Sequence, residues 1–381
     1  MKWQKYLIGE TFAIVSFAVF YYFQPTSLGS NQMIPFDSDR WEITAKESRV
    51  ENYLGQKSLL LKGGFAVVKD SEFTDGIIEF DIAFTGERGF MGGLWRVQDL
   101  GNYEKYYMRP HQSGNPDASQ YAPVYNTISS WQLYYGDGYS GQIKYPMNQW
   151  VQVKIVVAGK NAEVYVQDMS KPLLFVNELK RETKSGKVGL LVEDFAPGHF
   201  ANFSYTSISN PPLQGKAKPP DNGEQSNIRA WFVSNSFDEK TLDGKFSLNP
   251  ADKEKLTWRK FNAEDSGMLN LAQAQGIEKG KNCAFARITI NSDREQVKKL
   301  KFGFSDRIKV YFNNQLLYSG HDEFQSRDYR FLGTVGYWDE LYLPLKKGEN
   351  ELWMAVTETP TKGGWGLKAT FENPAGISLL D

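Results

Sequence analysis

Cysteine, histidine and excess charge are all scarce in this chain. The 381 residues include one cysteine, Cys283, which excludes a disulfide framework and a zinc site built on paired thiolates. The three histidines have no second ligand at the spacing of a metal motif. The net charge is −1, with 44 Lys and Arg against 45 Asp and Glu, so no basic surface is available for nucleic acid. No cofactor is expected, and only a structural calcium stays open, because backbone carbonyls can hold calcium without leaving a motif.

Long hydrophobic runs are also missing, except near the N-terminus. Lys2 and Lys5 precede an apolar run of 13 residues, Thr11 to Phe23, and Pro25 and small residues follow it. This run is short for a bilayer span of about 20 residues, which favours a cleaved signal peptide at residues 1–29. The alternative is a retained membrane anchor that starts near residue 7 and uses flanking Trp and Tyr side chains at the interface. Both interpretations predict export to the periplasm or the extracellular space, with membrane contact only through this segment if it is uncleaved.

Proline and glycine concentrate in residues 209–227, which contain four prolines and two glycines. Proline cannot donate a backbone hydrogen bond, so this stretch is predicted to be a linker. It separates a domain at residues 33–208 from a second domain at residues 228–373. Because such linkers let few contacts cross, the two domains are expected to fold independently.

Strand-period alternation runs through both halves of the chain. Apolar side chains occupy every second position of residues 78–84 and 151–157 in the first half, and of residues 308–312 and 341–345 in the second. Asn313-Asn314 is a turn pair that tolerates positive φ. Helical turns are predicted only near residues 251–255 and 293–299. The predicted fold class is therefore all-β, with two antiparallel β-sandwich or jelly-roll domains joined by a Pro/Gly-rich linker.

Each half also resembles a known family. Residues 73–82, 92–96 and 150–166 resemble the concanavalin-A-like lectin/glucanase superfamily, including its laminin-G-type and 3-keto-disaccharide-hydrolase-like members. Residues 305–314 and 343–352 resemble galactose-binding-type jelly rolls, although Asn314 stands where those modules commonly have glycine. The resemblance implies a lectin-like sandwich followed by an accessory sugar-binding module. It does not imply one activity, because that fold hosts lectins, hydrolases and structural modules.

Glu79 and Asp81 are the candidate catalytic residues. Two positions apart on one strand, they face the same way at about 7 Å, within the range of paired carboxylates in glycoside hydrolysis. The resembling glucanase motif, however, places a second Glu one or two residues later, where this chain has Ala83 and Phe84. Solvated carboxylates on a polar sheet face are therefore the preferred interpretation, and catalysis is not expected from this pair.

A denser group of aromatic, amide and charged residues lies between residues 103 and 139. Tyr103, Lys105, Tyr107, Arg109 and His111 share one parity on a predicted strand and its exit. Aromatic rings can stack on a sugar while amide, carboxylate and guanidinium groups bind its hydroxyls. The predicted ligand-binding residues are Arg109, His111, Asp117, Gln120, Tyr121, Tyr125, Asn126, Trp131 and Tyr134. Structural strand and turn residues, with Arg109 paired to Asp117, are the alternative.

The loops of the second half carry further aromatic and charged groups. Trp338 and Trp365 stand in two of these loops, and capping of the hydrophobic core is the preferred role for both. Taken together, the sequence predicts an exported carbohydrate-binding protein whose partner is a glycan or small saccharide. The alternatives are a glycoside hydrolase acting on a disaccharide or polysaccharide, and an envelope scaffold that binds other proteins.

Overall fold

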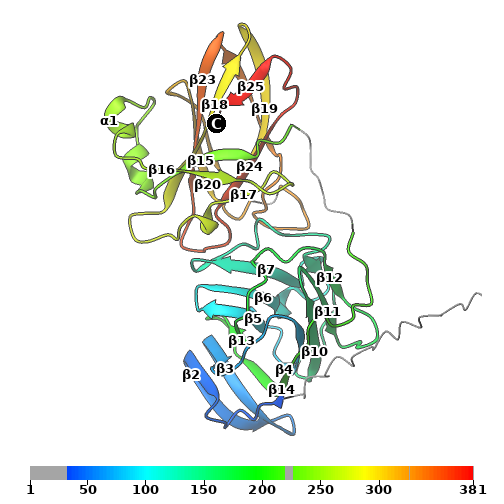
Figure 1. Cartoon of the computed structure of the whole chain (residues 1–381). Coiled ribbons are helices and arrows are strands. Elements are labelled where there is room, and N and C mark those ends of the chain that lie inside the picture. Colours follow the sequence, from blue (N-terminus) through cyan, green and yellow to red (C-terminus); the bar gives the residue numbers. More distant parts are fainter. Residues whose placement is uncertain (1–31, 219–225, 326, 381) are drawn as a thin grey trace, which may run out of the picture.

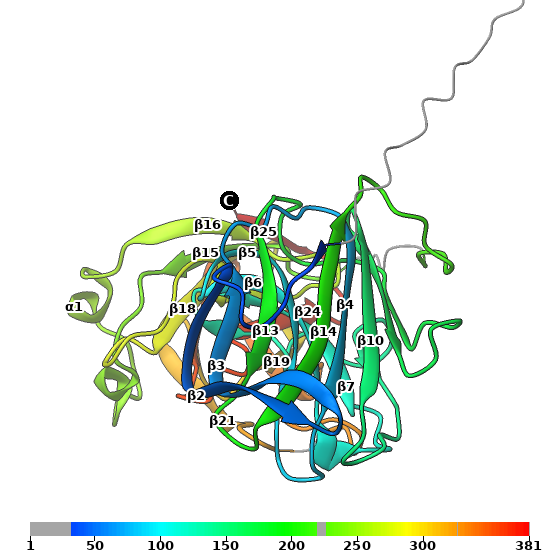
Figure 2. The ribbon, with the colours of Figure 1, turned by 90° about the horizontal axis from the view of Figure 1, so that it is seen from below.

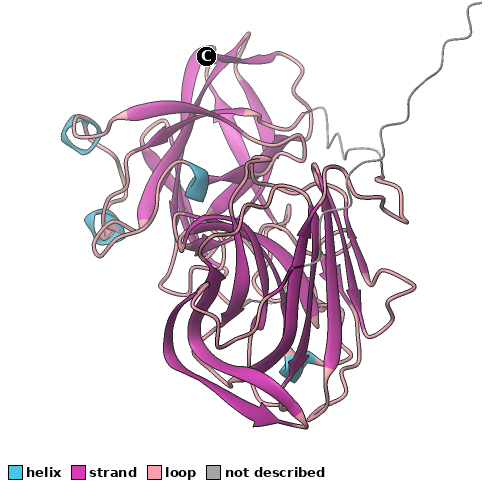
Figure 3. Ribbon diagram, turned by 60° about the horizontal axis from the view of Figure 1, so that its bottom comes forward, coloured by secondary structure: helices cyan, strands magenta, loops and turns pink. Residues whose placement is uncertain are grey.

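The computed structural model describes residues 32–218, 226–325 and 327–380, and nearly all regular structure in them is strand (Figure 3). The predicted signal peptide or anchor at residues 1–29 lies outside these residues. Among the residues described, no helix is long and apolar enough to cross a bilayer. Two antiparallel β-sandwiches, drawn blue to green and green to red, lie one above the other in Figure 1.

The first sandwich is one 14-stranded sheet that curls over its own core. Its strand order is β12-β11-β10-β4-β14-β3-β13-β5-β6-β7-β8, with β1, β2 and β9 paired at its sides. Figure 2 shows β10, β4 and β14 side by side. The strands are β1 (Gln32–Met33), β2 (Trp41–Tyr53), β3 (Gln56–Val68), β4 (Gly76–Ala83), β5 (Met91–Asp99), β6 (Asn102–Met108), β7 (Ser119–Tyr125), β8 (Ile128–Ser129), β9 (Ser140–Gly141), β10 (Val151–Ala158), β11 (Asn161–Val166), β12 (Leu174–Val176), β13 (Lys187–Val192) and β14 (Gly198–Ser207); a 3-10 helix, η1, spans Pro110–Gln112.

The alternation read from the sequence explains this core. Ile78, Phe80 and Ile82 of β4 are at most 1% exposed, and β4 pairs with β10 so that Ile155 lies opposite Ile78. A Cβ placed on Gly93 of β5 would meet both Ile155 and Phe80 at 3.0 Å, so the two halves of the curled sheet pack directly on each other.

The second sandwich consists of a seven-stranded and a four-stranded sheet. The larger has the order β16-β15-β18-β23-β20-β21 with β25 beside β18, and the smaller has the order β17-β24-β19-β22. A buried apolar cluster lies between them and includes Trp231, Phe302 and Trp365. The elements are β15 (Ala230–Ser234), η2 (Glu239–Leu242), α1 (Pro250–Lys253), β16 (Trp258–Asn262), β17 (Leu269–Asn270), η3 (Leu271–Gln273), β18 (Cys283–Ser292), β19 (Gln296–Phe304), β20 (Arg307–Phe312), β21 (Gln315–His321), β22 (Asp339–Leu345), β23 (Gly348–Thr357), β24 (Gly366–Phe371) and β25 (Ile377–Leu380).

Of the local predictions for the second half, the Asn-Asn turn and one helical turn are confirmed and the other helical turn is wrong. Asn313 and Asn314 form the β20–β21 turn with φ of 46° and 70°, as the pair predicts. One of the two predicted helical turns is present as α1. The other, at residues 293–299, is wrong, because residues 296–304 form β19 between β22 and β24. Pairing on both sides has overridden the helical preference of the charged residues there.

The two sandwiches are joined by more than the linker, so the expectation that few contacts cross between them is wrong. Ile128 of the first sandwich is 0% exposed and belongs to the apolar core of the second. Asn126 donates to the carbonyl of Ala272 at 2.9 Å, and Asn270 donates to Ser130 at 3.1 Å. The linker itself is held to the first sandwich, since the Gly215 amide donates to buried Glu163 at 2.5 Å. The domain limits read from the sequence stay a prediction.

Candidate functional site

The strand β6 has one face in the core and one face outside it, and the outer face is rich in aromatic and charged groups. Tyr106 and Met108 lie in the core, whereas Tyr103, Lys105 and Tyr107 point the opposite way, which agrees with their shared parity in the sequence. We call Tyr103, Lys105, Tyr107 and Arg109, with the side chains that contact them, the β6 face. The four named residues are 1–6% exposed, so little of their surface meets solvent.

Lys105 lies at the centre of the β6 face. Its ammonium nitrogen is 3.5 Å from a carboxylate oxygen of Glu193 and 4.6 Å from the centre of the Tyr107 ring. Burial lowers the pKa of Lys105, although Glu193 opposes that change. An ammonium group has three donors, so a long contact with one carboxylate leaves it able to donate to a ligand hydroxyl.

The Arg109 side chain is held in place by several hydrogen bonds. Its guanidinium donates to the carbonyl of Asp117 at 2.6 Å, and to Tyr107 Oη and Gln120 Oε1, both at 2.5 Å. The Asp117 carboxylate is 3.9 Å away. Gln120 is anchored in turn by donating to the carbonyls of Trp131 and Tyr134 at 2.8 and 2.6 Å. Arg109 therefore positions Gln120 and Asp117, and its guanidinium lies 5.9 Å from the Trp131 ring, which is half-buried.

The rim of the β6 face comes from loops that are distant in sequence. Phe90 contacts His111 edge-on at 5.2 Å and Phe195 at 5.4 Å, and Phe195 is 41% exposed. The Arg88 guanidinium lies 4.8 Å from the Phe195 ring. Burial, followed by the positive charges of Arg88 and Arg109, lowers the pKa of His111. At neutral pH the imidazole is therefore neutral. Its Nδ1 accepts from the Gly89 amide at 3.4 Å, which leaves Nε2–H as a donor.

The predicted site residues thus divide into three groups. Arg109, His111, Asp117, Gln120 and Trp131 are together at the β6 face. Tyr121 is not, because it follows Gln120 on β7 and points into the core, where its hydroxyl donates to buried Glu104. The last three residues lie toward the second sandwich: Tyr125 packs against its core, Asn126 binds the Ala272 carbonyl, and Tyr134 is buried and donates to Glu264.

Several residues of the face were missed from the sequence. Lys105 carried a signal, because it shares the parity of Tyr103 and Tyr107, but it was not included in the predicted site. Glu193, Phe90, Phe195 and Arg88 carried none, since they reach the face only through the pairing of β5 with β6 and β13.

The candidate catalytic pair is placed as ordinary sheet residues. Glu79 lies opposite Lys154 and Ser204 in register, and Asp81 accepts a hydrogen bond from Asn202 at 2.7 Å. Ala83 and Phe84, at the position of the glucanase acid, are 0% and 2% exposed. This arrangement supplies no proton donor next to the pair on its own strand.

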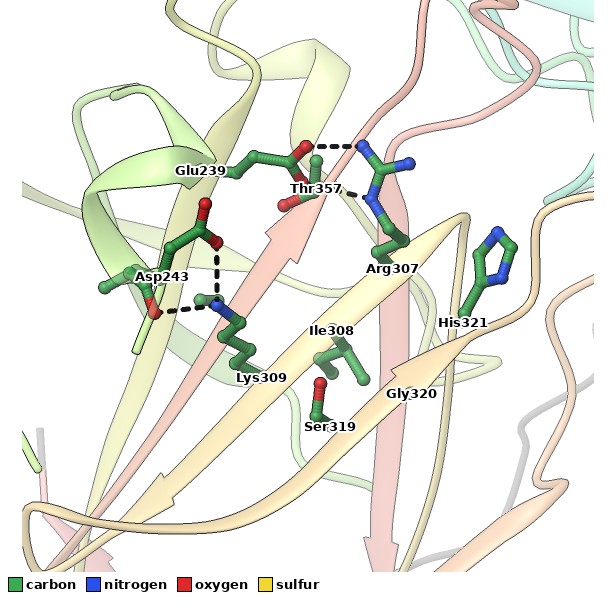
Figure 4. A pocket seen from close by; sticks show the side chains of 11 residues that line it. Glu239, Asp243, Arg307, Ile308, Lys309, Ser319, Gly320, His321 and Thr357 are labelled. Atoms are coloured by element: carbon green, nitrogen blue, oxygen red, sulfur yellow. Dashed lines mark hydrogen bonds and ion pairs between the residues drawn. The ribbon is translucent and has the colours of Figure 1, made fainter. Parts of the chain in front are cut away.

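The second sandwich contains a separate pocket of about 280 Å³ between η2 and the strands β20 and β21 (Figure 4). Arg307 forms a forked pair with Glu239 at 2.6 and 3.1 Å, and Lys309 donates to the Leu242 carbonyl at 2.7 Å. His321 is 3.5 Å from Glu323. Among the described residues that line the pocket, none has a Phe, Tyr or Trp ring. With its charges paired internally and no ring for stacking, it suits a sugar less well than the β6 face does.

The tryptophans in the loops of the second sandwich differ in burial. Trp365 is 0% exposed and donates to the Val356 carbonyl at 3.0 Å, which confirms its preferred role in the core. Trp338 is 38% exposed and donates to the Thr334 carbonyl at 3.0 Å. Within residues 32–218, 226–325 and 327–380, no three His, Cys, Asp or Glu side chains are grouped to hold a metal ion. Calcium bound by backbone carbonyls would not produce such a group.

No family model and no curated protein matches the chain. Three solved structures illustrate what it resembles. Carbohydrate-binding module CBM66 from Bacillus subtilis has 18% identity and a TM-score of 0.35, over 44% of this chain and 96% of that one. A Bacillus subtilis protein of unknown function with a galectin-like fold has 11% identity and a TM-score of 0.37, over 48% and 96%. Bacillus licheniformis beta-glucanase has 9% identity and a TM-score of 0.34, over 47% and 98%. Identities and scores this low carry no argument about the ligand or the activity of this chain.

Proposed function

We propose that this protein binds a carbohydrate at the β6 face and does not cleave it. The observation that carries the proposal is the sheltered outer face of β6, where Lys105 and Arg109 lie against the Tyr107 ring and Arg109 also lies near the Trp131 ring. The buried Lys105 ammonium has three donors and a 3.5 Å contact with one carboxylate, and a ligand rich in hydroxyl groups could accept from the other donors.

Each part of the face has a matching role in sugar binding. The half-buried Trp131 ring offers a surface for stacking, Lys105 and the Nε2–H of neutral His111 offer donors, and the Asp117 carboxylate offers acceptors. Arg109 is a positioning residue, because its guanidinium donates hydrogen bonds to Tyr107, Gln120 and the Asp117 carbonyl. Export, as the residues before position 30 predict, is part of the proposal and would bring the protein to extracellular or periplasmic glycans.

A glycan panel followed by calorimetry on two matched tryptophan variants tests this proposal. Trp131→Ala should weaken binding of the best glycan by about tenfold, since a ring contact is worth about 0.5–1.5 kcal/mol beyond area burial and about 1.4 kcal/mol corresponds to tenfold. Trp150→Ala is the control, because Trp150 is also half-buried in the first sandwich but contacts Tyr53 and the Leu54 carbonyl instead.

Melting curves of both variants separate loss of contact from loss of fold. Absence of wild-type binding across the panel, or equal weakening by both variants, would contradict the proposal. Release of reducing ends from a bound polysaccharide, lost in Glu79→Gln, would favour the hydrolase alternative instead.

A further inference from the structure

The segment between β21 and β22 of the second sandwich exposes several large apolar side chains. Phe324 is 44% exposed, Tyr329 is 93% exposed and Leu332 is 42% exposed. Three exposed apolar or aromatic side chains within nine residues make this segment a candidate binding surface. We call residues 324–335, excluding position 326, the aromatic loop.

The aromatic loop is attached to the first sandwich next to Trp131. The Phe331 ring lies 5.3 Å from Tyr135, whose hydroxyl donates to the Val335 carbonyl at 3.2 Å. The Gln132 backbone is inserted between two loops of the second sandwich, with its amide donating to Gly363 at 3.1 Å and its carbonyl accepting from Val335 at 3.0 Å. The loop therefore has a fixed position relative to the β6 face.

Residues 131–135 contact both surfaces. The amides of Leu133 and Tyr134 both donate to the Ser130 carbonyl at 3.1 Å, so residues 130–134 form a helical turn. Trp131 lies on this turn and Tyr135 follows directly after it. The Tyr135 ring contacts Phe331, and the Arg330 guanidinium lies against the rings of both Phe331 and exposed Tyr329.

Guanidinium groups accompany these rings, but their charge is balanced. Arg330 lies 5.4 Å from the Phe331 ring and 5.8 Å from the Tyr329 ring, and it forms a pair with Asp328 at 2.7 Å. Arg327 is 3.2 Å from Asp339. Rings with planar donors suit pyranose units, whereas a polyanion would require unpaired cations.

We infer that the binding surface extends over both sandwiches and that its ligand is a long, uncharged polysaccharide chain. The β6 face would take one part of the chain and the aromatic loop the next part. This inference rests on the proposed function, and it adds the ligand's length, its lack of charge and the involvement of the second sandwich. Because the interface holds both surfaces in place, no ordering of the domains is needed on binding.

The test compares short and long oligosaccharides of the neutral glycan that the full chain binds best in the panel. Affinity should rise at least tenfold with chain length and then level off. Tyr329→Ala should weaken binding of the longest oligosaccharide about fivefold or more and leave the shortest unchanged, whereas Trp131→Ala should weaken both. Tyr342→Ala is the matched control, since Tyr342 is 64% exposed but lies on β22 rather than in the aromatic loop.

Three contrary outcomes can be told apart. Length-independent affinity, or an unchanged Kd for Tyr329→Ala with the longest oligosaccharide, overturns the extended surface and leaves binding at the β6 face standing. No binding of any glycan by the wild type overturns the proposed function, and the inference with it. Tighter binding of a sulfated or uronic acid chain than of a neutral chain of equal length overturns the assignment of an uncharged ligand.

Discussion

Replacing Asp322 by asparagine should stabilise the protein at pH 8 and have little effect at pH 4. Asp322 precedes the aromatic loop and is 2% exposed. Its Oδ1 has no hydrogen-bond partner and lies 3.4 Å from Nε of Arg327. Burial, only partly offset by Arg327, raises the pKa of the Asp322 carboxyl from 3.8 to about 6. The ionised carboxylate is therefore an unfavourable group in the folded protein.

The direction in which stability changes with pH follows from proton linkage. Because the folded pKa lies above the unfolded one, the folded state binds more protons between about pH 4 and 6, and stability falls as the pH rises through this range. A difference of about two pH units corresponds to roughly 3 kcal/mol, at about 1.36 kcal/mol for each unit. Asparagine remains neutral, so we expect the free energy of unfolding of the Asp322→Asn variant to exceed that of the wild type by about 1–3 kcal/mol at pH 8. Near pH 4 the wild-type carboxyl is protonated in the folded state, so the two proteins should be about equally stable.

Tryptophan fluorescence during heating at pH 4, 6 and 8 measures this effect. A gain of about 1–3 kcal/mol should raise Tm by about 2–12 °C at pH 8, from the usual 2–4 °C per kcal/mol in domains of 150–250 residues. Asp70→Asn is the control, because Asp70 forms an exposed pair with Arg40 at 2.9 Å and such pairs contribute little. A destabilised variant at pH 8, or an equal gain at pH 4 and pH 8, would refute the reasoning.

Two further predictions concern the interface between the sandwiches. Ile128→Ala should lower the stability of the intact chain by about 2–5 kcal/mol, seen as a lower Tm, because Ile128 is fully buried in the core of the second sandwich. For the same reason, a fragment of residues 226–381 should melt at a lower temperature than the intact chain. An unchanged Tm would show that this contact is dispensable. Gly363→Ala should loosen the interface, measured as faster proteolysis of residues 209–227, because a Cβ there would meet Gln132 and come within 2.8 Å of the Trp131 ring. Gly86→Ala controls for the added methyl group, since a Cβ there would meet only Met147, at 3.9 Å or more.

The sequence predicts those features that depend on short-range alternation. The pattern at residues 78–84 and 151–157 corresponds to β4 and β10, which are neighbours in the sheet. The same period placed Tyr103, Lys105 and Tyr107 on one face of β6. Applied consistently, it would also have separated Gln120 from Tyr121, since neighbours on a strand point to opposite faces.

Contacts between distant segments could not be predicted in this way. Glu193 and Phe195 reach the β6 face only because β13 pairs with β5, and nothing local to these residues indicates that pairing. Tyr125 and Tyr134 resemble ligand-binding aromatics in the sequence, yet the second sandwich covers both. An amphipathic ring at a protein interface and one at a sugar site have the same chemistry, so only the position of the partner distinguishes them.

The composition of residues 209–227 was a poor guide to how the sandwiches are joined. A linker sets only the length of the tether, whereas the interface is set by side chains far from it, such as Gln132, which donates to Asp306 at 3.2 Å. This difference matters for binding. If only a flexible tether joined the β6 face to the aromatic loop, a long chain would meet two weak sites coupled by an effective concentration. Because Gln132 and Ile128 hold the sandwiches together, the two surfaces are preorganised, and loosening them by Ile128→Ala should weaken binding of a long chain more than binding of a short one.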